Sequence, residues 1–318
     1  MKNVTKLLSE IKIKEEGKRQ IESVCQLQLM SKPTSKLQIS LTGVSGVTHI
    51  STATPDHVWF SDGIHLFLAN VEGHNLHHLK CIRLVNYGIH TVNMTCDLIY
   101  IDRDYNIKKF FKDTRSKSTL MKKRSPWLPL CVVCSPSNND LLVGMLSTDT
   151  WAGKVTRYNN EGKVIQTIQH DTAGQQLYCL PRYITENRNG DVIVSDLTDI
   201  DNNDYGRGAV VVIDYKGRHR FSYTGHPSES DLLPHGICTD TLSNILLCDS
   251  KTNTIHLIDK DGHFMMQIQT QDQGIGRPMC LSFDHKNHLL WIGSCDSNKV
   301  CVYRYIERKN YLKNHCDD

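Results

Sequence analysis

The chain has 318 residues, of which 39% are hydrophobic and 22% charged, and its formal net charge is +3. This length suits two average domains or one large all-β domain, and the small net charge excludes the basic excess of a dedicated nucleic-acid-binding protein. Residues 1–20 lack the apolar core of a signal peptide, and no apolar run approaches the roughly 20 residues that span a bilayer. We therefore expect a cytoplasmic protein that does not contact a membrane.

In residues 1–30, positions of a heptad seam recur at alternating spacings of three and four residues. The positions are Val4, Leu7, Ile11, Lys14, Lys18, Ile21 and Cys25. This spacing predicts a short helical segment, which would be the remnant of a coiled coil. Oligomerisation is expected only if more of that coiled coil lies upstream.

After this segment, one short apolar stretch recurs six times. Its copies are "VWFSD" ending at Asp62, "LIYID" at Asp102, "LLVGM" at Met145, "VIVSD" at Asp196, "ILLCD" at Asp249 and "LWIGS" at Ser294. Each copy follows another apolar patch, and most precede an outer pair of apolar segments, with turns rich in Asp, Asn, Gly and Ser between them. Six four-stranded units at a spacing of 40–53 residues predict an all-β fold, a six-bladed β-propeller.

The last unit, from about Arg277 to Ile306, contains only three strands. Near the N-terminus, "SKLQISLTG" (residues 35–43) is a strand with no unit of its own. We expect it to supply the missing outer strand and close the ring, because closure removes exposed strand edges. The predicted organisation is a helical segment over 1–30, a propeller over 31–307 and a polar C-terminal tail over 308–318.

The stretch "LPHGICTDTLSNILLCDSKTNTIHLIDKDG" (residues 233–262) has the punctuation of an NHL repeat, as do "LIYIDRDYNIKKF" and "PRYITENRNGDVIVSD". On these residues the chain resembles the C-terminal NHL propeller of tripartite-motif (TRIM) proteins, of the divergent invertebrate type, over about residues 36–307. The resemblance implies the target-recognition half of a TRIM-type ubiquitin ligase in ubiquitin-dependent protein degradation. The zinc-binding RING and B-boxes of such relatives have no counterpart in this sequence, so the chain is expected not to be an enzyme by itself.

The innermost strand of each predicted blade begins at one mouth of the central channel. Alignment of the repeats predicts a set of binding residues around that mouth: His49, His90, Arg182, Tyr183, His235 and Arg277. Propellers bind ligands at such a mouth through loops from all blades, and we expect a protein partner there. A ring of histidines also suits a metal-dependent propeller enzyme, but only Glu186 adds a carboxylate nearby. We predict no metal, no cofactor and no catalytic residue.

The segment 108–124 contains eight Lys or Arg residues and one Asp, with Phe110 and Phe111 among them. Basic side chains neutralise phosphates and aromatic rings stack on bases. The alternative function is therefore binding of single-stranded RNA on a basic face. Its predicted contacts are Lys108, Lys109, Lys122, Lys123 and Arg124. A solvated pair of outer strands and a loop would explain the same composition.

Overall fold

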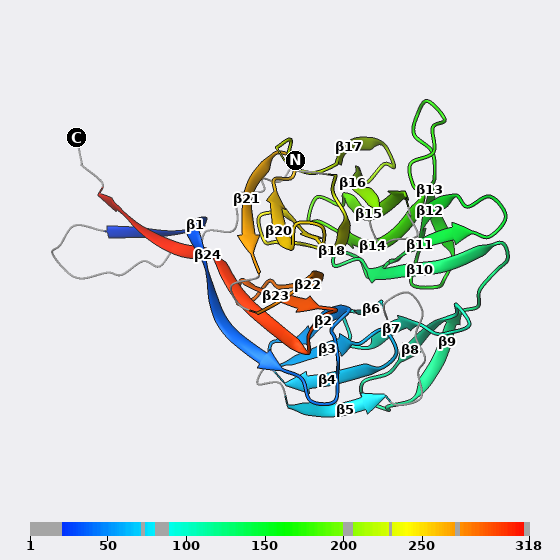
Figure 1. Cartoon of the computed structure of the whole chain (residues 1–318), viewed down its shortest axis with the longest axis horizontal. Helices are drawn as coiled ribbons and strands as arrows, with labels where there is room; N and C mark the ends of the chain where they lie inside the picture. The colour runs from blue at the N-terminus through cyan, green and yellow to red at the C-terminus, as the bar shows by residue number, and fades with distance from the viewer. Residues whose placement is uncertain are drawn as a thin grey trace.

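The computed structural model describes residues 21–70, 74–79, 89–199, 206–228, 231–270 and 274–314. Every regular element in these ranges is a strand, and the strands form six four-stranded sheets. The sheets are arranged as blades around a common centre (Figure 1). The predicted all-β, six-bladed propeller is therefore confirmed. Within the same ranges, no helix is long and apolar enough to cross a membrane.

In each of the first five blades, the strands follow one another in chain order from the channel outward. Blades 1 and 2 contain β2 (His49–Thr54), β3 (His57–Ser61), β4 (Leu66–Asn70), β5 (Asn75–Leu79), β6 (His90–Val92), β7 (Leu98–Ile101), β8 (Ile107–Phe110) and β9 (Lys117–Met121). Blades 3 and 4 contain β10 (Trp127–Cys134), β11 (Leu141–Ser147), β12 (Gly153–Tyr158), β13 (Val164–Ile168), β14 (Leu180–Glu186), β15 (Val192–Asp199), β16 (Arg207–Ile213) and β17 (His219–Tyr223). Blade 5 contains β18 (Pro234–Thr239), β19 (Ile245–Asp249), β20 (Thr254–Ile258) and β21 (Phe264–Gln269).

The sixth blade combines both ends of the described chain. Its strands, from the channel outward, are β22 (Pro278–Asp284), β23 (Leu289–Ser294), β24 (Lys299–Asn314) and β1 (Ile21–Ser40). β1 is antiparallel to β24, with Ser40 opposite Lys299 and Ile21 opposite Asn314. The N-terminal strand thus completes the last blade, as predicted. Figure 1 shows β1 and β24 continuing together beyond the ring as a two-stranded arm.

The predicted boundaries of the propeller are too narrow at both ends. Residues 21–30 belong to β1, so the helix predicted over 1–30 is wrong for that part, while residues 1–20 lie outside the described residues. The physical reason is that Leu27 and Leu29 alternate with the polar Gln26 and Gln28, which is the two-residue period of a strand, and pack on the core shared by blades 5 and 6. At the other end, β24 extends to Asn314, into the predicted tail over 308–318.

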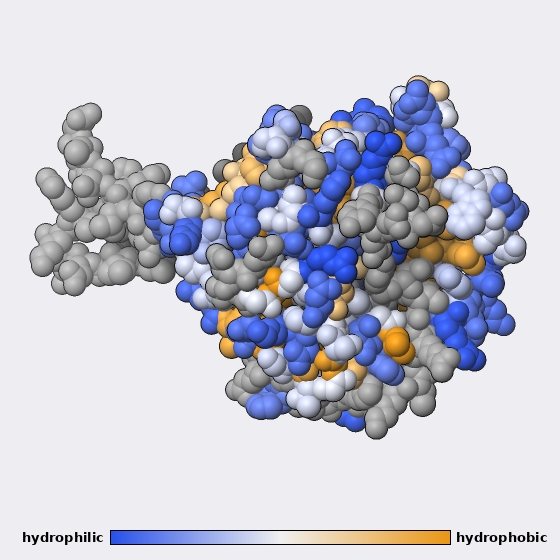
Figure 2. All heavy atoms as spheres, viewed as in Figure 1, coloured by the Kyte–Doolittle hydropathy of each residue, from blue (hydrophilic) through white to orange (hydrophobic). Residues whose placement is uncertain are grey.

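The core lies between the blades, where sheets pack face to face. β19 is buried along its whole length, because the strand is covered on both faces. Its last residue, Asp249, is 1% exposed and accepts hydrogen bonds from the backbone N–H groups of Leu233 and Lys251, both at 3.1 Å. The recurring Asp therefore ties the entry of the inner strand to the second strand of the same blade. The outer surface in view is mostly hydrophilic, with apolar side chains in small separate patches (Figure 2).

Gly236 lies where β18 of blade 5 comes close to the backbone of β22 of blade 6, and its replacement by Ala tests this packing. A Cβ at Gly236 would lie 2.5 Å from Cα of Cys280 and 2.8 Å from the carbonyl oxygen of Met279. Since both neighbours are backbone atoms of β22, we expect Gly236→Ala to lower the free energy of unfolding by about 2 kcal/mol or more in urea denaturation. In the control, Gly276→Ala, the new Cβ meets the movable Asp296 carboxylate at 3.1 Å, and a smaller loss is expected. Equal losses in the two variants would contradict the close-packing argument.

Candidate functional site

Four of the six predicted mouth residues contact one another across the channel. Nδ1 of His49 lies 3.3 Å from Nδ1 of His90, and the His49 ring is nearly parallel to the Tyr183 ring, with centroids 5.9 Å apart. Tyr183 also meets His235 edge to face, at 6.3 Å between centroids. The Tyr183 hydroxyl donates to the carbonyl oxygen of Thr48 at 3.1 Å, which joins blade 4 to blade 1. These side chains bridge the channel near its mouth.

The other two predicted residues, Arg182 and Arg277, lie around His235. Burial, and then the positive charges of Arg182 and Arg277, lower the pKa of His235 to about 3. Arg277 is exposed and held by Asp296, whose Oδ2 lies 3.3 Å from its Nε. All six residues predicted from the repeat alignment therefore lie near one another. At physiological pH the His235 side chain is neutral.

The contacts of His49 and His90 assign their protons. Nε2 of His90 lies 3.4 Å from the carbonyl oxygen of Trp59, which can only accept, so this nitrogen carries the proton and Nδ1 of His90 is an acceptor. Nδ1 of His49 must then be the donor to His90, which leaves the lone pair of His49 on Nε2. Burial, and then the neighbouring His90, hold the pKa of His49 well below 6.5. His49 is therefore a neutral imidazole in the channel wall, with Nε2 unprotonated.

Below the histidine pair, the channel contains a cavity of about 220 Å³. Residues of the inner strands of all six blades line it, and many of them carry hydroxyl groups: Ser51, Thr52, Thr91, Thr185, Thr239 and Ser282. Some hydroxyls also join neighbouring inner strands, such as Ser51 to the carbonyl of His90 and Thr239 to that of Glu186. A small cavity with this lining suits a small polar molecule.

Glu186, the last residue of β14, lines the same cavity and was not among the predicted contacts. Its side chain is almost fully buried, and its Oε1 accepts a hydrogen bond from Nη2 of Arg157. Its Oε2 has no hydrogen-bond partner in the part of the chain that the structure describes. A buried carboxylate oxygen without a donor is unfavourable, so a ligand hydroxyl would stabilise it. The sequence signal was the acidic residue that ends the apolar inner strand "YITE".

The histidines do not form a metal site with the residues in view. Among the described residues, no group of three or more His, Cys, Asp or Glu side chains could hold a metal ion. His49 and His90 are adjacent, but the Tyr183 ring lies between His49 and His235. The residues present do not fit a metal, and we assign no step to one.

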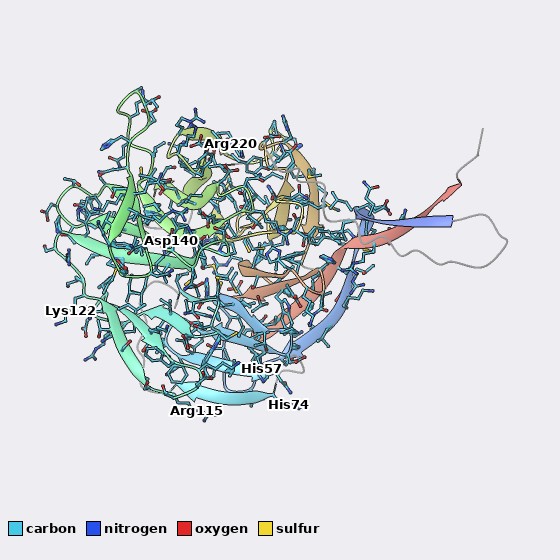
Figure 3. The ribbon with its side chains drawn as sticks, turned by 180° about the vertical axis from the view of Figure 1, so that it is seen from behind. His57, His74, Arg115, Lys122, Asp140 and Arg220 are labelled. Carbon is cyan, nitrogen blue, oxygen red and sulfur yellow. The ribbon has the colours of Figure 1, made fainter. Side chains whose placement is uncertain are left out.

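Two of the five predicted basic contacts lie on β8 and three follow β9. Nζ of Lys109 lies 2.8 Å from Oδ2 of Asp97, whereas Lys108 donates to Thr119 at 2.7 Å and lies 3.6 Å from Asp102. Carboxylates therefore balance both charges on β8. The remaining three residues, Lys122, Lys123 and Arg124, follow β9 and are exposed. Figure 3 shows Lys122 and Arg115 near opposite ends of that strand.

Comparisons with known proteins show the fold. No protein-family model matches the sequence, and no curated protein is similar to it in sequence. A streptogramin B lyase structure is 16% identical, with a TM-score of 0.57, and the match covers 90% of this chain and 98% of that one. A gluconolactonase from Xanthomonas campestris is 11% identical, with a TM-score of 0.63 and 89% of each chain covered. A catalytically inactive virginiamycin B lyase from Staphylococcus aureus, solved with quinupristin, is 14% identical, with a TM-score of 0.56, and the match covers 88% of this chain and 99% of that one.

These comparisons correct one prediction and leave another without support. The expectation that the chain is not an enzyme is wrong as argued, because the solved structures that share its fold include a gluconolactonase and lyases. A missing RING has no bearing on chemistry in the channel of a propeller. None of the comparisons supports the finer resemblance to TRIM NHL propellers. At identities of 11–16%, the similarity establishes the propeller fold alone.

Proposed function

We propose that the chain is a propeller enzyme that binds a small polar lactone or ester in its central channel and hydrolyses it. The observation that carries this proposal is the His49–His90 pair, which leaves Nε2 of His49 as a neutral base in the wall of a hydroxyl-lined cavity. The presence of a lactonase and of lyases among proteins of the same fold supports the choice of substrate class.

His49 is the general base of the proposed reaction. Its Nε2 takes a proton from a water molecule while the water oxygen bonds to the acyl carbon of the substrate. When the tetrahedral intermediate breaks down, the C–O bond of the lactone is cleaved and the leaving oxygen takes the proton back from His49. His90 is a positioning residue, because its Nδ1 accepts from His49 and fixes the tautomer. Oε2 of Glu186 accepts a hydrogen bond from a substrate hydroxyl.

Replacement of His49 tests this function. We expect the purified chain to hydrolyse members of a panel of glucono-δ-lactone, simple γ- and δ-lactones and aryl esters, measured by proton release. His49→Ala should lower kcat/KM by about 100-fold or more, as loss of a general base does. His219→Ala is the matched control, because His219 is exposed on the outermost strand of blade 4. Failure to hydrolyse any compound of the panel, or equal rates for His49→Ala and the parent, would overturn the proposal.

Recognition of a cytoplasmic protein partner, which the TRIM resemblance implies, stays a separate prediction. A pull-down that is insensitive to nuclease would support it, independently of the chemistry in the channel. The pull-down tests recognition of the partner and not ubiquitin transfer.

A further inference from the structure

A second cavity lies between blades 2 and 3, away from the central channel. Its volume is about 770 Å³, and β9, the following loop and strands β10 to β13 line it. Lys122 is at its margin, on the outer edge of the molecule (Figure 3). We refer to this cavity as the inter-blade cleft. Its position separates it from the histidine pair and from Glu186.

The inter-blade cleft carries an excess of positive charge. Five cationic side chains line it, and Glu161 is the one carboxylate of the lining: the cations are Lys122, Lys123, Arg124, Lys154 and Lys163. Within the described ranges, none of the five forms an ion pair. A pocket lined by cations without carboxylate partners favours an anionic ligand, because the ligand supplies the missing counter-charge.

Lys154 shows that this charge is partly withdrawn from water. Its side chain is half-buried, and burial lowers its pKa below the usual value. Its ammonium group lies 3.7 Å from the centroid of the Trp127 ring, a cation–π contact. No carboxylate of the described residues pairs with Lys154. An anion bound at this position would therefore stabilise its charged form.

Part of the lining of the inter-blade cleft is apolar. Met121, Trp127, Pro129, Met145 and Tyr158 form it. Tyr158 and Arg124 both line the cleft, where burial raises the pKa of Tyr158 and the charge of Arg124 opposes that rise. The cations and the apolar wall therefore face the same space, which suits a ligand that combines anionic groups with a planar ring.

We propose that the inter-blade cleft binds a free nucleotide, with its phosphates on Lys122, Arg124 and Lys154 and its base against the apolar part of the lining. The surroundings favour a free nucleotide over a long single strand. On β8, next to the cleft, Lys108 and Lys109 are paired with Asp102 and Asp97, so this strand offers no unpaired positive charge to a longer strand. This site is independent of the proposed lactone hydrolysis.

Binding of ATP with a fluorescent label on its ribose, followed by anisotropy at fixed ionic strength, tests the proposal. We expect saturable binding that unlabelled ATP displaces. The double variant Lys122→Glu/Arg124→Glu should weaken it by about tenfold or more. The double variant Lys112→Glu/Lys117→Glu changes the net charge equally but alters exposed residues outside the inter-blade cleft, and should bind as the parent does. If both double variants weakened ATP binding equally, the effect would come from net charge alone, and the proposed site would be overturned.

Three further probes separate the ligand classes. Inorganic triphosphate should compete more weakly than ATP, because it lacks the base that packs on the wall. Equal competition by triphosphate would overturn the role of the apolar lining in binding the base. A 12-nucleotide single-stranded RNA is the third probe. If it binds far more tightly than ATP and loses affinity in Lys122→Glu/Arg124→Glu, the ligand is a nucleic acid and the proposal of a free nucleotide is overturned. Absence of saturable ATP binding to the full chain would overturn the proposal outright. Thermal melting of each variant confirms that it is folded.

Discussion

Glu186→Ala is expected to lower the free energy of unfolding by about 3–5 kcal/mol, because it leaves a buried guanidinium without its closest partner. The Arg157 side chain is 10% exposed and pairs with Oε1 of Glu186. The nearest other carboxylate, that of Asp140, lies 3.7 Å from Nη1 of Arg157. Urea denaturation at pH 7, with an unchanged m-value, measures the loss.

A second substitution shows whether Glu186→Ala destabilises the chain through an unpaired charge or through lost packing. In Glu186→Ala/Arg157→Met the guanidinium is gone, and most of the lost stability should return. The matched control is Glu307→Ala, which removes a carboxylate from an exposed pair with Lys309 and should change stability by less than about 1 kcal/mol. If the double variant is as unstable as Glu186→Ala, the buried charge is not the cause.

The second large effect depends on pH and comes from Asp196. This residue ends the repeat segment "VIVSD" and is 1% exposed. Burial raises the pKa of its carboxyl to about 7, although the backbone N–H groups of Cys179 and Leu180 donate to it. Because the folded-state pKa exceeds the unfolded value of 3.8, the folded chain holds this proton more tightly. The resulting stabilisation is present below about pH 4 and is lost as pH rises to about 7.

Asp196→Asn should remove this pH dependence. The side-chain oxygen of Asn still accepts from the backbone, but the group cannot ionise. We therefore expect the variant to match the parent at pH 4 and to exceed it by an amount on the order of 4 kcal/mol at pH 8. Urea midpoints at pH 4, 5, 6, 7 and 8 measure the trend. A difference that is constant over this range would contradict the assignment.

Asp214→Asn provides a control of opposite sign. At Asp214 burial favours a higher pKa, but hydrogen bonds from Arg218 and Lys216 outweigh burial and lower the pKa below 3.8. A depressed folded-state pKa stabilises the protein above the unfolded pKa. Asp214→Asn should therefore lose stability relative to the parent as pH rises through about 4, the reverse of the trend for Asp196→Asn.

The architecture could be predicted because each blade is encoded locally. Five of the six apolar segments end at polar residues, and one of these, Asp249, accepts backbone hydrogen bonds from Leu233 and Lys251 that tie two strands of its own blade together. The surplus N-terminal strand and the three-stranded last unit predicted the pairing of β1 with β24. Residues 21–30 were mispredicted because their spacing fits a heptad as well as a strand. Pairing with β24, nearly 300 residues away, decides between the two.

By itself, the sequence determined the all-β class, the number of blades, the closure of the ring and the gathering of His49, His90, Tyr183 and His235 at one mouth. These features follow from strand periodicity and from the equivalent positions of repeated units. Only the tertiary structure decided the tautomers of the histidine pair and the Glu186 oxygen that has no hydrogen-bond partner among the described residues. It also decided which cations of the segment 108–124 are paired with carboxylates. Each of these depends on partners from another strand or blade, and the sequence does not state which polar groups meet there.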